Sequence, residues 1–344
     1  MCVPLPRHGS SSSAVYFENN LTQSAFTRER VEVIKLLASQ ASISMENARI
    51  YEKQEKLLKA QQRFVPGEFL KHLGHRDISR VQLGESVSME MTVLFSDIRN
   101  FTSLAEKLSP QAVIELLNYL YSELAVPIRA SGGFIDSYSG DGIMALFAVP
   151  AKQAITAAIG MSSTLSAYNQ RNQGQSKIRI GLGINTGPLV LGTMGADDRM
   201  QCSVLGDNVN LASRIEQLTR VYEAQCLVSE QTLMAVGDPE TFSTRLVDRV
   251  AVKGKYMAVK LYEILDAESD ERRKTKESTK DLLAEAMESY YARSFATAEK
   301  IFREGMKQDP MDLVFQLFAE RSARYIENAP PEEWQGFEKL QKKH

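Results

Sequence analysis

The chain has 344 residues, of which 43% are hydrophobic and 24% charged, and its formal net charge is −2. This composition is that of an ordinary globular protein and excludes disordered and fibrous classes, while the length predicts two or three folded units. The small net charge gives no support for bulk attraction to nucleic acid or to an anionic membrane, so we expect neither as a partner.

The cysteines and histidines exclude further classes of chemistry. Cys2, Cys202 and Cys226 are odd in number and far apart, which excludes a disulfide framework and fits a reducing cytoplasm. No histidine lies between residues 76 and 343, so the middle of the chain has neither a histidine base nor a histidine-rich zinc site. No apolar run reaches the roughly 18 residues that a membrane span needs. We expect a cytoplasmic protein.

A long helix is expected after a short strand near the N-terminus. Residues 14–18 have a strand pattern, and a stretch without proline or glycine from about Thr27 to Gln62 predicts the helix. Within it, four aliphatic residues recur every seven positions, the period of a coiled coil: Leu36, Ile43, Ile50 and Leu57. A dimer stalk and an ordinary amphipathic helix explain this pattern equally well.

Strand and helix patterns then alternate. A strand pattern over Met91–Asp97 is followed by a helix that starts at Ser109–Pro110, and two strands, Phe134–Tyr138 and Ile143–Val149, are joined by a tight turn that holds Asp141. The alternation continues with a helix over residues 151–171, strands over residues 178–185 and 189–193, and a helix over residues 207–222. The pattern predicts helices packed on a mixed sheet.

The C-terminal part has a different composition. Residues 267–281 contain no large apolar residue, which predicts a solvated, charged linker. The apolar and small residues beyond it have the spacing of a tetratricopeptide helix pair, although a generic helical hairpin explains them as well: Leu282, Ala286, Ala298, Phe302, Gly305 and Pro310. We expect a further helix over residues 311–327, and these helices could serve a protein partner.

Two aspartates stand at the ends of predicted strands. Asp97 ends a buried strand, and a helix that begins near Thr102 would offer free backbone N–H groups to an anion while Asp97 supplies a hard oxygen ligand to Mg²⁺. A helix-capping role explains Asp97 equally well. Asp141 lies between Gly140 and Gly142, which let the backbone turn sharply. The two acids can meet only if their strands are neighbours, which the strand–helix–hairpin order allows.

Four segments together resemble the motifs of class III adenylate and guanylate cyclases, in order and in spacing. They are residues 94–102 (LFSDIRNFT), Gly140–Asp141, residues 206–214 (GDNVNLASR) and residues 252–255 (VKGK). The resemblance covers residues 88–266. It implies an α+β fold with a ferredoxin-like βαββαβ core, in a catalytic domain that makes a cyclic nucleotide.

The resemblance also implies roles for single residues. Asp97, Asp141 and the backbone carbonyl of Ile98 would bind two Mg²⁺ or Mn²⁺ ions per active site, and such a pair stabilises in-line attack of the ribose 3′-OH on the α-phosphorus. Asn210 and Arg214, four residues apart on one helical face, would orient the ribose and neutralise the phosphate in the transition state.

Phosphate binding is implied for Phe101, Thr102 and Lys253. Members of the family place the aspartates on one subunit and the asparagine, arginine and lysine on the other, which implies a head-to-tail homodimer with two equivalent sites. Ser137 and Ser203 occupy the base-recognition positions, where adenylate cyclases usually have a lysine and an aspartate or threonine. A serine can donate or accept, so the two serines suit adenine and guanine alike.

The remaining segments complete the expected organisation. Residues 1–50 resemble the last strand and exit helix of a GAF sensor domain, and residues 51–87 would be a helical linker. Since only the tail of a GAF domain is present, we expect a fragment or a misplaced start. The leading interpretation is an adenylate cyclase in signal transduction that converts ATP to 3′,5′-cyclic AMP. A guanylate cyclase that uses GTP and a non-catalytic nucleotide-binding module are the alternatives.

Overall fold

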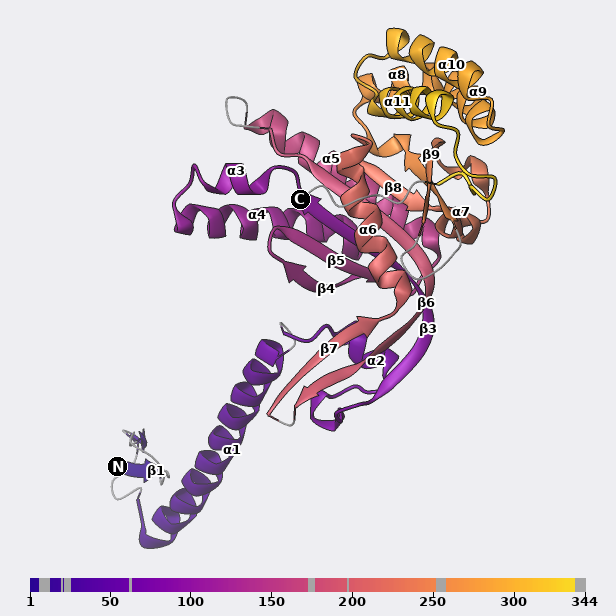
Figure 1. Ribbon diagram of the computed structural model, residues 1–344. Helices are drawn as coiled ribbons and strands as arrows, with labels where there is room; N and C mark the ends of the chain where they lie inside the picture. Colours follow the sequence, from indigo (N-terminus) through magenta and orange to yellow (C-terminus); the bar gives the residue numbers. More distant parts are fainter. Residues whose placement is uncertain are drawn as a thin grey trace. The chain divides into compact units, whose positions relative to one another are not determined.

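The computed structural model describes residues 1–5, 13–19, 21, 26–61, 64–172, 177–196, 198–251 and 258–337. These residues form two compact units, Met1–Gly67 and Glu68–His344 (Figure 1). Lys253 lies outside the described residues. In the described ranges, no helix combines the length and the apolar character that crossing a membrane requires.

The N-terminal unit consists of a two-stranded sheet and one long helix. β1 (Cys2–Leu5) pairs antiparallel with β2 (Ser13–Tyr16), and α1 spans Arg28–Gln61. Val3 and Leu5 of β1 pack against Ala38 of α1 in a small apolar cluster. The strand and the long helix expected from the sequence are confirmed, whereas their origin in a GAF domain stays a prediction.

A mixed sheet organises the second unit. Its first four strands are adjacent in the order β4-β5-β3-β6, with antiparallel pairs throughout: β3 (Ser86–Ile98), β4 (Phe134–Ser139), β5 (Gly142–Phe147) and β6 (Ile180–Ala196). α4 (Pro110–Ala130) connects β3 to β4, and α5 (Ala151–Arg171) connects β5 to β6. This is the βαββαβ order, so the predicted ferredoxin-like α+β core is confirmed.

Further strands extend the sheet beyond β6. β8 (Cys226–Ser229) runs parallel to the first half of β6 and is followed by β10 (Ala258–Ile264) and β9 (Thr244–Ala251), while β7 (Arg199–Leu205) pairs with the second half of β6. β3, β6 and β7 form a long arm that projects past the core (Figure 1). The connecting helices are α2 (Gly67–His72), α3 (Phe101–Ala105), α6 (Asp207–Val221) and α7 (Glu230–Val236).

Helices cover both faces of the sheet. Apolar residues of α4 and α5 form one cluster with residues on one face of the sheet, among them Leu182 and Ile184 of β6. α6 lies against the opposite face, where Gly181 and Gly183 alternate with those residues. A Cβ on Gly183 would lie 2.1 Å from the backbone nitrogen of Glu216, so only glycine allows α6 to approach this closely.

The two strands expected over residues 178–185 and 189–193 are wrong as separate strands, because β6 runs unbroken through both. Residues 186–188, which separated the two expected strands, are part of β6. Pro188 falls between the segment that pairs with β8, which ends at Ile184, and the segment that pairs with β7, which begins at Val190. The missing N–H of proline is tolerated there because that edge has no ladder partner.

The solvated linker expected at residues 267–281 is also wrong. These residues include α8 (Asp270–Ser278), and Lys276 of this helix is only 1% exposed. Its ammonium group donates to the carboxylates of Glu263 and Glu268. Lys276 therefore pairs inside the molecule, while charged neighbours such as Glu271 and Lys274 are exposed, and composition alone does not distinguish them.

Three C-terminal helices share a core with the sheet and α6. They are α9 (Lys280–Tyr291), α10 (Phe295–Gln308) and α11 (Leu313–Glu327), which includes the further helix expected over residues 311–327. Their aromatic residues pack with Leu211, Ile215 and Leu218 of α6 in one cluster. The helices therefore belong to the same compact unit as the sheet, while their tetratricopeptide character stays a prediction.

Candidate active site

Asp97 and Asp141 meet at one edge of the sheet. Asp97 is the penultimate residue of β3, and Asp141 lies in the turn between β4 and β5. β3 and β5 are neighbours, with Ser96 opposite Ile143. Burial raises the pKa of Asp97, and the nearby charge of Asp141 raises it further. The structure thus provides the strand pairing on which the predicted acid pair depends.

The glycines beside Asp141 allow this close approach. A Cβ on Gly142 would lie 2.6 Å from the carbonyl oxygen of Ser96, and Gly140 has a φ of +62°. The hydroxyl of Tyr121 on α4 donates to the carbonyl oxygen of Gly140. The ring of Tyr121 also contacts Tyr138 of β4, with the ring centroids 4.4 Å apart. The contacts of Tyr121 therefore fix the turn to α4.

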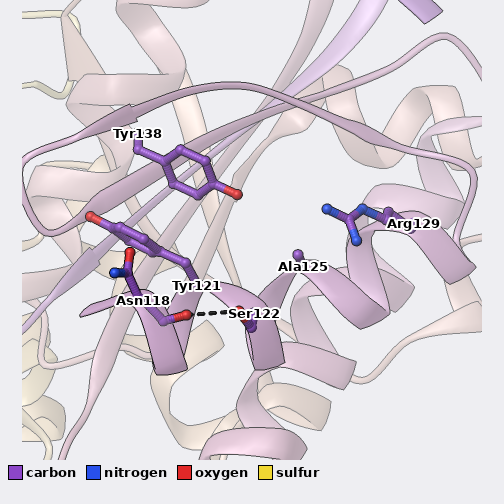
Figure 2. A pocket seen from close by; sticks show the side chains of 6 residues that line it. All are labelled: Asn118, Tyr121, Ser122, Ala125, Arg129 and Tyr138. Atoms are coloured by element: carbon purple, nitrogen blue, oxygen red, sulfur yellow. Dashed lines mark hydrogen bonds between the residues drawn. The ribbon is translucent and has the colours of Figure 1, made fainter. Parts of the chain in front are cut away.

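A cavity of about 430 Å³ lies beside this turn, between α4 and β4. Figure 2 shows the rings of Tyr121 and Tyr138 at one end of it and Arg129 at the other. The remaining lining residues are Asn118, Ser122 and Ala125. The lining contains none of the metal, phosphate or base residues predicted from the sequence, so the cavity neighbours the candidate site without forming it.

Two arginines that the sequence reading missed connect β3 to α6. Arg220, in the last turn of α6, donates to Asp97 Oδ2. Arg99 follows β3 and is largely buried, and its guanidinium donates to the carbonyl oxygens of Thr219 and Ala224 at the end of α6. Arg220 and Asp97 are far apart in the chain, so no local sequence signal announces their contact.

Glu216 is a third carboxyl group beside the pair. It lies on α6 against Gly181, the residue opposite Asp97 in the β3–β6 register. Burial raises its pKa to about 7, and the charge of Asp97 contributes in the same direction. Its Oε1 atom is buried and has no hydrogen-bond partner among the described residues. The sequence holds one signal that could have indicated Glu216: the glutamate stands beside core positions of an amphipathic helix, such as the buried Ile215.

The acid pair suits a divalent cation that also binds a substrate. In the described part of the chain, no three His, Cys, Asp and Glu side chains are grouped to hold a metal ion by themselves. Mg²⁺ commonly binds one or two carboxylates together with substrate phosphates. Asp97 and Asp141 offer hard oxygen ligands of this kind, and a cation between them would relieve the repulsion that raises the pKa of Asp97.

The predicted catalytic residues lie earlier on α6, Asn210 in its first turn and Arg214 near its middle. Asn210 is exposed in the first turn of the helix, one turn before Arg214. Arg220, which contacts Asp97, follows Asn210 by ten residues, or about 15 Å along the helix axis. Asn210 and Arg214 share a face of α6 as expected. A single chain does not bring Asn210 to the aspartate pair.

The predicted base and phosphate residues are found on three elements. Ser137 lies on β4 and Ser203 on β7, and both are half-buried. Asp136, whose pKa is raised to about 6 by burial, interacts with Ser137, and its charge also raises the pKa of Cys202 after the larger effect of burial. The charge of Asp136 on β4 thus acts on Cys202 of β7, and these are the two residues that precede the serines.

α3 begins immediately after the segment that carries Asp97. Phe101 and Thr102 are its first two residues, and Asn100 before them has a left-handed φ of +58°. Ile98 is buried at the end of β3. These positions put the first turn of α3 next to the acid pair in the chain, which is the arrangement expected from the sequence.

Comparison with known proteins identifies the family. Residues 85–266, more than half of the chain, match the family described as the adenylate and guanylate cyclase catalytic domain. The chain belongs to this family. Nucleotide cyclases are enzymes of the lyase class. The sheet and the helices that cover it therefore form a cyclase catalytic domain.

Two relatives are adenylate cyclases. The chain is 37% identical over 271 residues to the terminal-differentiation specific adenylate cyclase of Dictyostelium discoideum, covering 77% of this chain and 13% of that protein. It is 38% identical over 222 residues to an adenylate cyclase of Anabaena cylindrica, covering 62% of this chain and 44% of that protein. The chain thus spans less than half the length of either relative.

A solved structure shares the fold. A bacterial light-regulated adenylyl cyclase superposes with a TM-score of 0.58 and is 23% identical, and the match covers 67% of each chain. This likeness concerns the fold alone.

Proposed function

We propose that this chain is an adenylate cyclase that converts ATP to 3′,5′-cyclic AMP and pyrophosphate. The observation that carries the proposal is the meeting of Asp97 and Asp141 at one sheet edge, in a chain that belongs to the cyclase family. Adenine as the base is supported by the two adenylate cyclases to which the chain is 37% and 38% identical. Ser137 and Ser203 suit adenine and guanine alike.

The acid pair and its surroundings account for the chemistry. Asp97, Asp141 and the carbonyl oxygen of Ile98 would hold two Mg²⁺ or Mn²⁺ ions, which supply Lewis-acid stabilisation for phosphoryl transfer. Phe101 and Thr102 at the start of α3 would direct their backbone N–H groups toward the triphosphate. Lys253 would add a positive charge at the terminal phosphates.

A homodimer would complete each site. Asn210 and Arg214 precede Arg220, the residue that contacts Asp97, by about 15 Å and about 9 Å along α6, so we expect their ribose and phosphate contacts to come from a second copy of the chain. A two-fold arrangement of two copies creates two such sites. The exposed heptad residues of α1 support a dimer stalk: Leu36, Ile43, Ile50 and Leu57.

The wider role is in signal transduction in the cytoplasm. The N-terminal unit, as the tail of a GAF domain, would transmit a signal to the catalytic domain through α1. The C-terminal helices would offer a surface to a protein partner.

Incubation of the purified chain with Mn²⁺ and either ATP or GTP tests the proposal, with products quantified by mass spectrometry. We expect cyclic AMP from ATP. Asp97→Ala should lower turnover at least about 100-fold, because the cation loses a ligand, without a change in circular dichroism. Cyclic GMP as the sole product would overturn the adenylate assignment. Equal inactivity of wild type and variant with both nucleotides would favour a non-catalytic binding module.

A further inference from the structure

Asp97 is paired with a cationic side chain, that of Arg220. The guanidinium of Arg220 donates to Asp97 Oδ2, and the two side chains are 54% and 24% exposed. Arg220 lies in the last turn of α6, where the helix dipole favours a positive charge. An ion pair this open to water contributes little to stability, so it can be broken at small cost.

A second acceptor lies within reach of the same guanidinium. Glu216 precedes Arg220 by four residues, so both side chains project from one face of α6. Glu216 Oε1 would lie 3.1 Å from a Cβ on Gly181, the residue opposite Asp97 in the β3–β6 register, so this carboxyl group lies beside the aspartate that Arg220 contacts. Glu216 Oε1 is buried and has no hydrogen-bond partner among the described residues. A buried carboxyl oxygen without a hydrogen-bond partner costs free energy, so a hydrogen bond donated to Glu216 would be stabilising.

Arg220 and a divalent cation compete for one carboxylate. Both are positive, and a cation bound by Asp97 would lie within the contact distance that Arg220 now occupies. A guanidinium cannot lose its proton to relieve this repulsion. Repulsion therefore favours departure of Arg220 from Asp97 when a metal ion binds, and Glu216 Oε1 is an acceptor without a partner among the described residues, one helical turn away.

We propose that Arg220 is a positioning residue with two partners, Asp97 and Glu216, and that a divalent cation bound by Asp97 shifts it from the first partner to the second. The inference rests on the proposed function, because it takes Asp97 as a metal ligand. By pairing with Asp97, Arg220 lowers the affinity of that carboxylate for cations. Glu216 offsets part of that loss, since it accepts the displaced guanidinium.

Titration with Mn²⁺ alone, followed by the electron paramagnetic resonance signal of free Mn²⁺, tests this arrangement without nucleotide or turnover. Arg220→Gln should bind Mn²⁺ about fivefold more tightly than wild type, the factor expected when a partly exposed competing ion pair is removed. Arg179→Gln is the matched control. Arg179 is an exposed arginine that pairs with Glu223, so the control removes the same charge without touching Asp97.

The role of Glu216 is tested by a double-mutant cycle. Glu216→Gln should weaken Mn²⁺ binding about threefold in the wild-type background and less in the Arg220→Gln background, because the residues act as a pair. Thermal unfolding checks that Glu216→Gln folds. Equal effects of Glu216→Gln in both backgrounds would contradict the exchange of partners.

Asp97→Asn distinguishes a failure of this inference from a failure of the proposed metal-binding role of Asp97. Asp97→Asn combined with Arg220→Gln should abolish the tighter site. If Mn²⁺ binding never depends on Asp97, the proposed metal pair fails, and the inference fails with it. If binding depends on Asp97 while Arg220→Gln matches Arg179→Gln, only the inference is overturned.

Discussion

Three carboxyl groups around the candidate site lie where burial disfavours their charged form. Asp97 belongs to the acid pair, Glu216 lies beside it on α6, and Asp136 lies on β4 beside Ser137. Burial is the largest cause of the raised pKa at each of them. Such clustering is typical of sites that bind cations or transfer phosphoryl groups, because a bound ligand can replace the hydration that burial removes from the carboxylates.

Asp136 gives a pH-dependent prediction. Its pKa is raised from 3.8 to about 6, so between these values the folded protein binds more protons than the unfolded chain. Stability should therefore fall as pH rises from about 4 to 6 and level off above. Asp136→Asn removes the buried charge and should stabilise the protein by about 1–2 kcal/mol at pH 7.5, discounted for partial exposure, with little change at pH 4.

Thermal unfolding of Asp136→Asn at both pH values measures this difference. Asp198→Asn, at an exposed position, is the control and should change little at either pH. An equal gain in stability at pH 4 and pH 7.5 would contradict the account, because the buried charge exists only at the higher pH.

At the scale of elements, the approach of α6 to β6 positions Glu216 and Arg220. Gly181 and Gly183 leave the sheet surface flat under the helix, and Arg99 fixes the end of the helix through two backbone carbonyls. The distance between the two elements decides whether Arg220 reaches Asp97. A small displacement of α6 would therefore alter the acid pair as well as the core.

Gly183→Ala tests the close packing. The new Cβ would lie 2.1 Å from the backbone nitrogen of Glu216, and backbone atoms of a helix cannot move aside cheaply. We expect a loss of about 2–3 kcal/mol in the free energy of unfolding, measured by urea denaturation. Gly67→Ala, where nothing lies within 4 Å of a new Cβ, should change it by less than about 0.5 kcal/mol. Similar losses in both variants would contradict the close approach.

Local signals in the sequence predicted the elements that local chemistry determines. Ser109 caps α4 by accepting from the backbone N–H of Ala112, and the glycines beside Asp141 form the expected hairpin turn. The contacts of Arg220 and Lys276 were missed because they depend on which distant segments meet. A charged side chain looks solvated in a sequence until its buried partner is known.

The continuity of β6 was missed for a related reason. Whether Pro188 breaks a strand depends on the hydrogen-bond partners of its neighbours, and those belong to β7 and β8. The acid pair itself was predicted because its motif residues and the strand order both point to one edge. Its meeting required the pairing of β3 with β5, which only the structure supplies.

At the scale of the whole molecule, the C-terminal helices are bound to the catalytic sheet by charge as well as by apolar packing. Arg321 of α11 donates to Asp248 of β9, which also accepts from the hydroxyl of Tyr222 at the end of α6. Arg245 of β9 pairs with Asp312 at the start of α11. The helices thus brace β9 and the end of α6, the helix that carries Arg214 and Arg220.

Arg321→Ala should be strongly destabilising. The variant leaves the buried Asp248 without its arginine, and we expect a loss of about 3–5 kcal/mol in the free energy of unfolding. Arg303→Ala removes an exposed arginine that pairs with Glu299 one turn earlier, and should lose less than about 1 kcal/mol. Urea denaturation of both variants compares them directly. Equal losses would show that the C-terminal helices are not braced by the buried pair.

The most direct test of the account is complementation between two inactive variants. Asp97→Ala lacks a metal ligand and Arg214→Ala lacks the phosphate contact, so each homodimer should be inactive. A mixed dimer would contain one intact site, and an equal mixture should recover about a quarter of wild-type cyclic AMP production from ATP. No recovery from the mixture, while each variant remains folded and dimeric, would contradict a site that takes Asp97 from one copy and Arg214 from the other.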